Sequence, residues 1–139
     1  MIAYFDTSSL VPLFVEEAGS GRASLLWDQA DHVAGVRLLY AECRAALAMA
    51  TRLGRLSTRA LRTAVIDLEV LYQQIDIVEV SDDLVRRAGT LSEIHSLRGY
   101  DAVHLAAGET FIGQDVVFVA GDGPLYEAAK SMGLAVART

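Results

Sequence analysis

Four carboxylates in this sequence occur where their neighbours favour buried structure. Asp6 and Asp122 each follow a short apolar run, Asp101 precedes a helix-forming segment, and Glu42 lies inside another. In a parallel sheet, ligands bind beyond the carboxyl ends of the strands, where Asp6 and Asp122 would lie. We therefore expect the four acids to converge on one edge of a sheet.

The negative charge of four acids in one site must be compensated, and bound metal ions are one way to do so. Two carboxylates about 5 Å apart repel by about 3 kcal/mol at an effective dielectric constant near 20. A cluster of four therefore requires bound cations or large pKa shifts. Oxygen ligands suit Mg²⁺ or Mn²⁺, and the sequence has no Cys/His spacing typical of zinc sites. Such a site activates a water molecule and stabilises the leaving oxygen in phosphodiester cleavage.

Three of the acids also have an ordinary structural interpretation. Asp6 suits a turn or a helix cap after its strand, and Asp122 in "GDGP" suits a turn. Asp101 suits the N-cap of the helix that follows it. His104 lies one helical turn after Asp101, and it either touches the site or is a buried structural histidine.

Glu42 lies on a predicted helix face that is otherwise apolar, with Leu38, Ala45 and Met49 at helical spacing. A carboxylate on such a face is costly to bury unless a cation or hydrogen-bond donors meet it. The alternative to a metal ion is a buried ion pair with one of the nearby arginines.

The elements that must position these acids alternate between strands and helices. Apolar, β-branched runs predict strands at 2–5, 33–36, 75–80, 116–120 and 134–137. Helical spacing and caps predict helices at 9–16, 20–30, 37–53, after Ser57 as far as Tyr72, after Ser81, 101–111 and 124–132. This alternation favours a mainly parallel sheet covered on both faces. We expect a single three-layer α/β/α domain, residues 1–139, with about five central strands.

Composition limits the class of protein further. The chain has 139 residues, a net charge of −6 and one cysteine, Cys43, which excludes an internal disulfide and fits a reducing, cytoplasmic setting. Cys43 lies in an Ala/Leu-rich helical stretch, so we expect it in the core. No apolar run is long enough for a membrane span, and no signal peptide is evident at the N-terminus.

Four segments carry a resemblance to a known family. They are "YFDTSSLV", "LLYAECRAAL", "RGYDAVHLAA" and "VFVAGDGPLYEAA". In this order they resemble the PIN-domain nucleases, and above all the VapC-like toxins of type II toxin–antitoxin pairs. The resemblance extends over essentially the whole chain.

The resemblance implies a divalent-metal-dependent endoribonuclease toxin, with RNA as substrate, Mg²⁺ or Mn²⁺ as cofactor, a cognate antitoxin as partner, and a homodimer. The implied metal-binding and catalytic residues are Asp6, Glu42, Asp101 and Asp122. Ser8 matches a hydroxyl that supports the first acid. The family usually has Thr or Ser two residues before the last acid, and this chain has Ala120.

Two other classes remain as alternatives. A haloacid-dehalogenase-like phosphatase shares "FDTSS" and "GDG", but Ser8 replaces its second Asp, Tyr126 replaces its further acid, and Lys130 follows the "GD" instead of preceding it. A non-catalytic PIN-like interaction module would retain the fold without the reaction. Retention of all four acids weighs against the module.

An arginine-rich segment offers a basic surface on an otherwise acidic chain. Six arginines and one acid occur between residues 37 and 62. Arginine suits phosphate contacts, although a solvated helix face is the simpler interpretation. We hypothesise that Arg52, Arg55 and Arg59 bind RNA beside the metal site.

Overall fold

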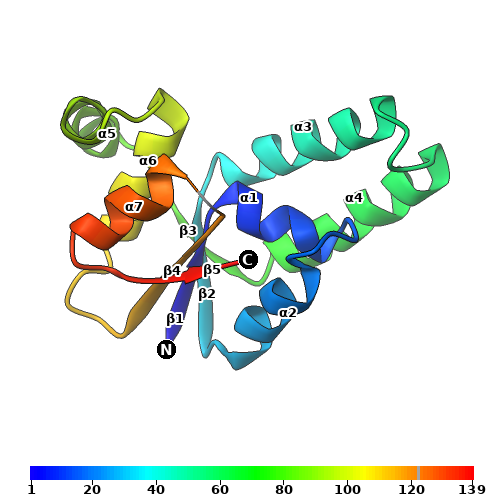
Figure 1. The fold of residues 1–139 in the computed structure, drawn as a ribbon, viewed down its shortest axis with the longest axis horizontal. Coiled ribbons are helices and arrows are strands. Elements are labelled where there is room, and N and C mark those ends of the chain that lie inside the picture. The colour runs from blue at the N-terminus through cyan, green and yellow to red at the C-terminus, as the bar shows by residue number, and fades with distance from the viewer. Residues whose placement is uncertain (122) are drawn as a thin grey trace.

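A five-stranded parallel sheet forms the centre of the protein in the computed structural model, which describes residues 1–121 and 123–139 (Figure 1). The strands are β1 (Ile2–Phe5), β2 (His32–Val36), β3 (Ile75–Val78), β4 (Val116–Ala120) and β5 (Ala135–Arg138). Their order across the sheet is β3-β2-β1-β4-β5, and every neighbouring pair is parallel. The predicted three-layer α/β class is confirmed.

Helices cover both faces of this sheet (Figure 1). One side carries α1 (Thr7–Leu10), the 3₁₀ turn η1 (Val11–Leu13), α2 (Ser20–Gln29), α3 (Leu39–Arg52) and α4 (Thr58–Tyr72). The other carries α5 (Asp82–His95), α6 (Gly99–Glu109) and α7 (Pro124–Ser131). In the described part of the chain, no helix is long and apolar enough to span a bilayer.

Alternation along β1 divides the core into two apolar clusters. Successive strand residues point to opposite faces of a sheet. Tyr4 therefore joins the cluster under α5, α6 and α7, where its ring stacks on Phe118 at a centroid distance of 4.9 Å. Phe5 joins the cluster under α1 to α4 with Leu39 and Leu47. Full burial of each large side chain contributes about 1.5–3 kcal/mol.

A glycine allows α6 to pack closely on the sheet. A Cβ atom on Gly108 would lie 2.5 Å from the Phe118 ring, which is too close for two carbon atoms. Only glycine fits this position without a shift of α6 or of Phe118. The register of α6 matters because its first turns carry Asp101 and His104.

Several predicted boundaries are wrong, and the helix expected at 37–53 begins only at Leu39. The helix expected at 9–16 begins at Thr7, because the Asp6 side chain caps it directly after β1, and Pro12 then lies in a 3₁₀ turn. The strand expected to reach residue 80 ends at Val78. The helix expected at 101–111 begins at Gly99 with Arg98 at the N-cap position, so Asp101 lies inside the first turn and is not the N-cap.

Candidate active site

A cleft of about 440 Å³ opens at the carboxyl edge of the sheet and receives side chains from four segments far apart in sequence. The chain leaves β1 toward β2 and β3 and later returns to β4 on the other side of β1. Such a reversal creates a crevice at the ends of the central strands. Asp6, Glu42 and Asp101 all line the cleft. Asp122 lies outside the described residues.

Asp6 is held by the first turn of α1. Its Oδ1 accepts hydrogen bonds from the Ser9 backbone N–H at 2.9 Å and from the Ser8 hydroxyl at 3.0 Å, and Oδ2 lies 2.8 Å from the same hydroxyl. Asp6 is therefore the N-cap of α1 as well as a cleft residue. The residue is 6% exposed, and its burial raises the pKa of the carboxyl, while nearby His104 and the bonds from Ser9 and Ser8 act in the opposite direction.

Ser8 connects this turn to the end of β4. Its Oγ also accepts a hydrogen bond from the Gly121 backbone N–H at 3.3 Å. The hydroxyl thus contacts the Asp6 carboxylate on one side and the β4 end of the cleft on the other. This is the contact that a supporting role for Ser8 requires, and the role itself stays a prediction.

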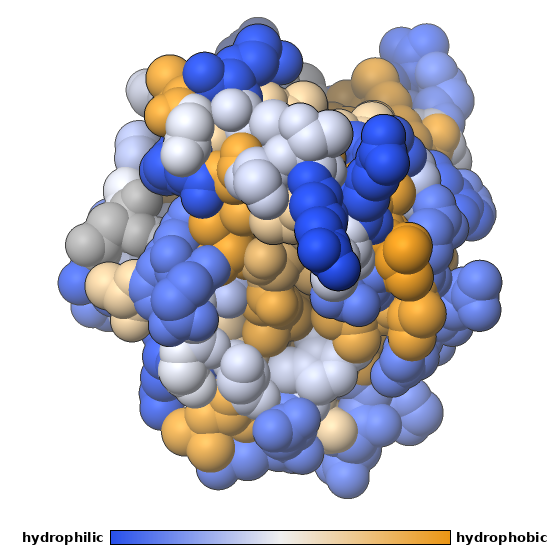
Figure 2. Space-filling view, turned by 90° about the vertical axis from the view of Figure 1, so that its right-hand side faces the viewer, coloured by the Kyte–Doolittle hydropathy of each residue, from blue (hydrophilic) through white to orange (hydrophobic). Residues whose placement is uncertain are grey.

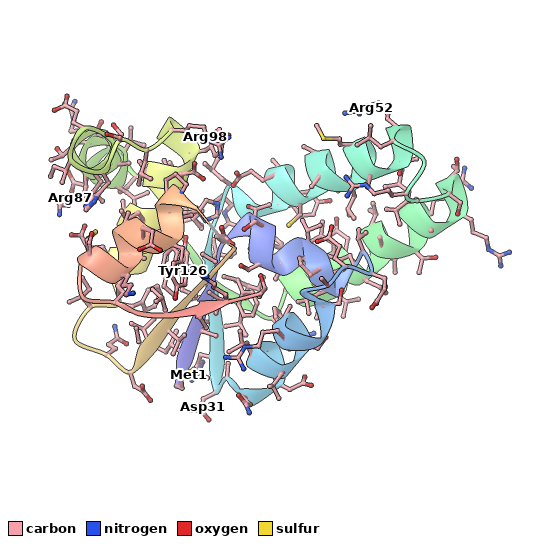
Figure 3. All side chains as sticks on the ribbon, in the orientation of Figure 1. Met1, Asp31, Arg52, Arg87, Arg98 and Tyr126 are labelled. Carbon is pink, nitrogen blue, oxygen red and sulfur yellow. The ribbon has the colours of Figure 1, made fainter. Side chains whose placement is uncertain are left out.

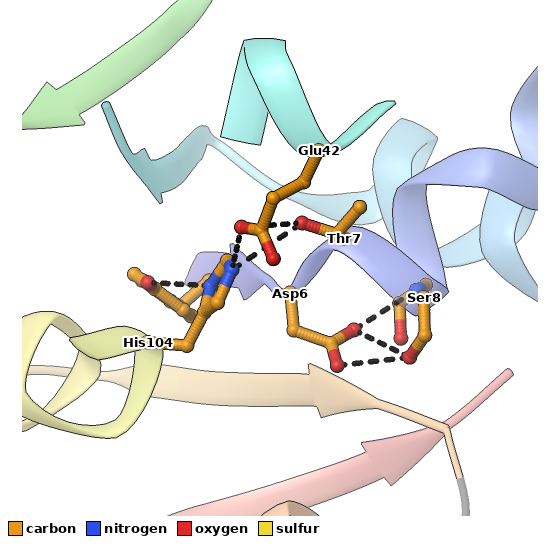
Figure 4. A network of polar contacts seen from close by, with 7 residues as sticks. Asp6, Thr7, Ser8, Glu42 and His104 are labelled. Carbon is orange, nitrogen blue, oxygen red and sulfur yellow. Dashed lines mark hydrogen bonds and ion pairs between the residues drawn. The ribbon is translucent and has the colours of Figure 1, made fainter. Parts of the chain in front are cut away.

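Glu42 has different partners from those expected. Its Oε1 accepts a hydrogen bond from the Thr7 hydroxyl at 3.1 Å and lies 2.7 Å from Nε2 of His104 (Figure 4). The predicted alternative, an ion pair with a nearby arginine, is not among the contacts of Glu42 in the described part of the chain. Within the same part, Oε2 has no hydrogen-bond partner, so that oxygen is available for another ligand.

The helix face predicted to bury Glu42 is also wrong. The core face of α3 carries Leu39, Cys43, Leu47 and Ala50. Met49, which was expected on the same apolar face as Glu42, is half exposed. The placement of Cys43 in the core is confirmed, and burial raises the pKa of its thiol to about 12.

His104 joins the cleft to the core beneath it. The side chain is 2% exposed, and its Nδ1 lies 3.2 Å from the Tyr4 hydroxyl (Figure 4). A carboxylate only accepts hydrogen bonds, so Nε2 of His104 carries the proton that faces Glu42. On the other side of the ring, burial raises the pKa of Tyr4 well above its usual value, so the Tyr4 hydroxyl beside Nδ1 keeps its proton. Both sequence interpretations apply, because the histidine is buried and also contacts Glu42 in the cleft.

Asp101 pairs with a residue that the sequence analysis missed. Arg98 Nε donates to Asp101 Oδ2 at 2.9 Å across the first turn of α6. Tyr100 and Thr7 also line the cleft and were missed. The available signal was proximity, because Thr7 follows Asp6 and the pair Arg98 and Tyr100 flanks Gly99 just before Asp101.

The donor set fits a hard divalent cation by its chemistry. Burial raises the pKa of the Asp6 carboxyl, so a cation beside it would stabilise the charged form. Glu42 and Asp101 supply further oxygens in the same cleft. Across residues 1–121 and 123–139, no three His, Cys, Asp or Glu side chains already lie close enough together to hold a metal ion. Ligation by this set therefore needs adjustment of Glu42 and Asp101, or a contribution from outside the described residues.

The arginines proposed for RNA binding lie elsewhere. Arg52 ends α3 ten residues after Glu42, which is about 15 Å along a helix. Arg55 and Arg59 follow in the turn and the first turn of α4. None of the three lines the cleft, and Figure 3 shows Arg52 at the outer end of α3, far from Arg98. Their role in RNA binding stays a prediction.

Comparisons with known proteins identify the family of this chain. The PIN domain profile matches residues 3–111. Ribonuclease VapC45 of Mycobacterium tuberculosis is 39% identical over 136 residues, which cover 98% of this chain and 94% of that protein.

Solved structures share the fold. VapC20 of Mycobacterium tuberculosis, a toxin that cleaves the sarcin–ricin loop, superposes with a TM-score of 0.71 at 22% identity and 99% coverage of both chains. VapBC-5 of the same organism, a toxin–antitoxin system, gives a TM-score of 0.62 at 18% identity, with 99% of this chain and 96% of that chain covered. The chain therefore belongs to the PIN-domain family and, within it, to the VapC-like group.

Proposed function

We propose that this protein is a divalent-metal-dependent endoribonuclease, the toxin of a toxin–antitoxin pair, which hydrolyses RNA phosphodiester bonds by a metal-activated water. The observation that carries this proposal is the placement of Asp6, Glu42 and Asp101 in one cleft at the strand ends. The 39% identity to a curated ribonuclease over nearly the whole chain supports RNA as the substrate.

Two of the proposed ligands are oriented by hydrogen bonds from neighbouring residues. Asp6 and Glu42 each accept hydrogen bonds from two residues, Ser8 and Ser9 in one case and Thr7 and His104 in the other. These bonds orient the carboxylates before a cation arrives. Asp101 and, from the sequence alone, Asp122 complete the proposed set. Bound Mg²⁺ or Mn²⁺ would lower the pKa of a ligated water and offset charge on the leaving oxygen.

The test is endonucleolytic cleavage of a long structured RNA by purified protein. We expect cleavage with Mg²⁺ or Mn²⁺, none in excess chelator, and recovery when metal is restored. Asp82→Asn is a matched control for Asp101→Asn, because Asp82 also pairs with an arginine, Arg86, but lies outside the cleft. Full activity in chelator would contradict the proposal. Release of phosphate from small phosphomonoesters would favour the phosphatase alternative, and an inert but correctly folded protein the interaction module.

We also propose a cognate antitoxin, a homodimer and a cytoplasmic location. The toxin–antitoxin assembly of VapBC-5 supports the partner. The side of the molecule that carries the α3–α4 hairpin shows an apolar band between hydrophilic residues (Figure 2), and Met49 and Leu53 are exposed at that end of α3. A small reading frame just upstream should encode the antitoxin. Co-purification of its product, and the molar mass of the free protein by light scattering, test both assemblies.

A further inference from the structure

The candidate cleft presents an electrostatic difficulty for an RNA substrate. Its described lining includes four carboxylates, those of Asp6, Glu17, Glu42 and Asp101. Arg98 is the exposed cation among those lining residues, whereas His104 is buried and hydrogen-bonded to Glu42. A phosphate that enters this cleft therefore meets Arg98 as its complementary side chain.

Arg98 is arranged so that most of its donors are free. Its Nε donates to Asp101, and within residues 1–121 and 123–139 its two Nη groups have no hydrogen-bond partner. The side chain is 72% exposed, so it reaches solvent at the mouth of the cleft. Two parallel Nη donors match the oxygens of a phosphate.

Tyr100 supplies an aromatic surface beside this cation. The guanidinium of Arg98 lies 4.6 Å from the centroid of the Tyr100 ring, and Tyr100 is 44% exposed although it is a large hydrophobic residue. Both side chains line the same cleft as the four carboxylates. Unpaired RNA bases stack on exposed aromatic rings and on arginine planes, while a paired base has its faces covered.

We propose that Arg98 and Tyr100 form a nucleotide subsite at the mouth of the cleft, in which the guanidinium binds a phosphate and the ring stacks on an adjacent unpaired base. This inference rests on the proposed ribonuclease function and specifies how the substrate is held. Asp101 holds Nε of Arg98, and the free Nη groups are the donors to the phosphate.

The first experiment tests stacking as a coupling between one base and one ring. Binding of a fluorescent single-stranded RNA is measured in chelator, with intact RNA verified on a gel, and repeated with oligonucleotides that carry one abasic position each. In the wild type, one abasic position should weaken binding by roughly 5- to 150-fold. In Tyr100→Ala that position should cause no further loss, whereas Tyr100→Phe should behave as the wild type.

Tyr40→Ala is the control for the loss of an aromatic ring. Tyr40 also has an arginine, Arg44, over its ring at 5.8 Å, but it does not line the cleft. Tyr40→Ala should therefore lose as much affinity at the abasic position as the wild type does. If Tyr100→Ala fails to fold, Tyr100→Leu keeps an apolar side chain without an aromatic face and tests the same coupling.

The second experiment tests the phosphate contact through the salt dependence of binding. Arg98→Gln should reduce the slope of log affinity against log salt concentration by about 0.7, the value for one single-strand phosphate contact. Arg86→Gln is the matched control, because Arg86 is 78% exposed and its Nε donates to Asp82 at 2.8 Å on α5, outside the cleft. Arg86→Gln should leave the slope unchanged.

The outcomes separate this inference from the function beneath it. If the wild type neither binds nor cleaves RNA, the ribonuclease proposal fails and this subsite fails with it. If the wild type binds and cleaves RNA but the abasic and Tyr100→Ala losses add independently, only the stacking inference is overturned. Equal salt slopes for Arg98→Gln and Arg86→Gln would contradict the phosphate contact of Arg98 and leave the ribonuclease proposal standing.

Discussion

Two charged regions of this protein differ in how their charges are held. The cleft is acidic and concave, and hydrogen bonds between segments far apart in sequence fix its side chains, such as that from the Gly121 backbone N–H to Ser8, 113 positions away. The outer end of the α3–α4 hairpin is basic, and its arginines, Arg52, Arg55 and Arg59, are exposed. Exposed charges contribute little to stability, whereas buried charges must be compensated. Burial with long-range partners therefore identifies the candidate site better than charge density does.

The largest expected effect comes from the buried acid. Asp6→Asn and Asp101→Asn should each abolish cleavage, because each removes a proposed metal ligand. In chelator, Asp6→Asn should melt at the same temperature as the wild type or higher, since asparagine keeps the Oδ1 that accepts from Ser8 and Ser9 and no longer buries a charge. A loss of several kcal/mol in either variant would mean that the residue is mainly structural.

The stability difference between the wild type and Asp6→Asn should depend on pH in chelator. Burial raises the pKa of Asp6 in the folded state, so the folded protein holds that proton more tightly than the unfolded chain does. As the pH rises from the unfolded pKa through the folded one, the wild type should lose stability relative to Asp6→Asn, and the gap should then persist at higher pH. Melting curves of both proteins at several pH values measure this difference. A gap that closes with rising pH would contradict the sign.

A smaller effect is expected from the side chain that orients Glu42. His104→Phe should weaken Mn²⁺ binding and lower cleavage by about 10- to 100-fold, the usual consequence of losing a residue that positions a ligand. His104→Gln retains an N–H donor near Nε2 and should recover part of both. Calorimetric titration with Mn²⁺ provides a measurement independent of cleavage. If both variants bind metal as tightly as the wild type, His104 is only a core residue.

The hairpin arginines should act on binding alone. Replacement of Arg52, Arg55 and Arg59 together with Gln should reduce the salt slope of RNA binding by about 2 if all three contact phosphates. Metal affinity should not change, because these residues do not line the cleft. Salt titrations of wild type and triple variant compare the slopes. Equal slopes would show that this basic end is a solvated face.

The smallest effect should come from a helix cap in the same hairpin. Ser57 caps α4, and its Oγ accepts from the Ala60 backbone N–H at 3.0 Å. Ser57→Ala should reduce the free energy of unfolding by about 1 kcal/mol. Cleavage well below the melting temperature should be unchanged, and denaturant unfolding beside a cleavage assay measures both. A loss of activity comparable to that of Asp6→Asn would erase the distinction between cleft and hairpin.

Much of the fold was accessible from local sequence patterns. The apolar runs of β1 and β4 identify buried strands, and Ser57 and Ser81 mark helix starts, because strand burial and capping depend on residues within one turn or strand. Helix faces were harder. Glu42 was assigned to an apolar face, yet the core face of α3 begins at Leu39, and helical spacing alone allowed both choices.

By itself, the sequence determined the residue types of the site and their position at strand and helix ends, as with Asp6 directly after β1. It also determined the family, through four segments in order. Only the tertiary structure decided the partners, such as His104 for Glu42, 62 positions away, and Arg98 as the cation of the cleft. The physical reason is that periodicity and capping act over a few residues, whereas hydrogen-bond partners and burial depend on how the sheet brings distant segments to one edge.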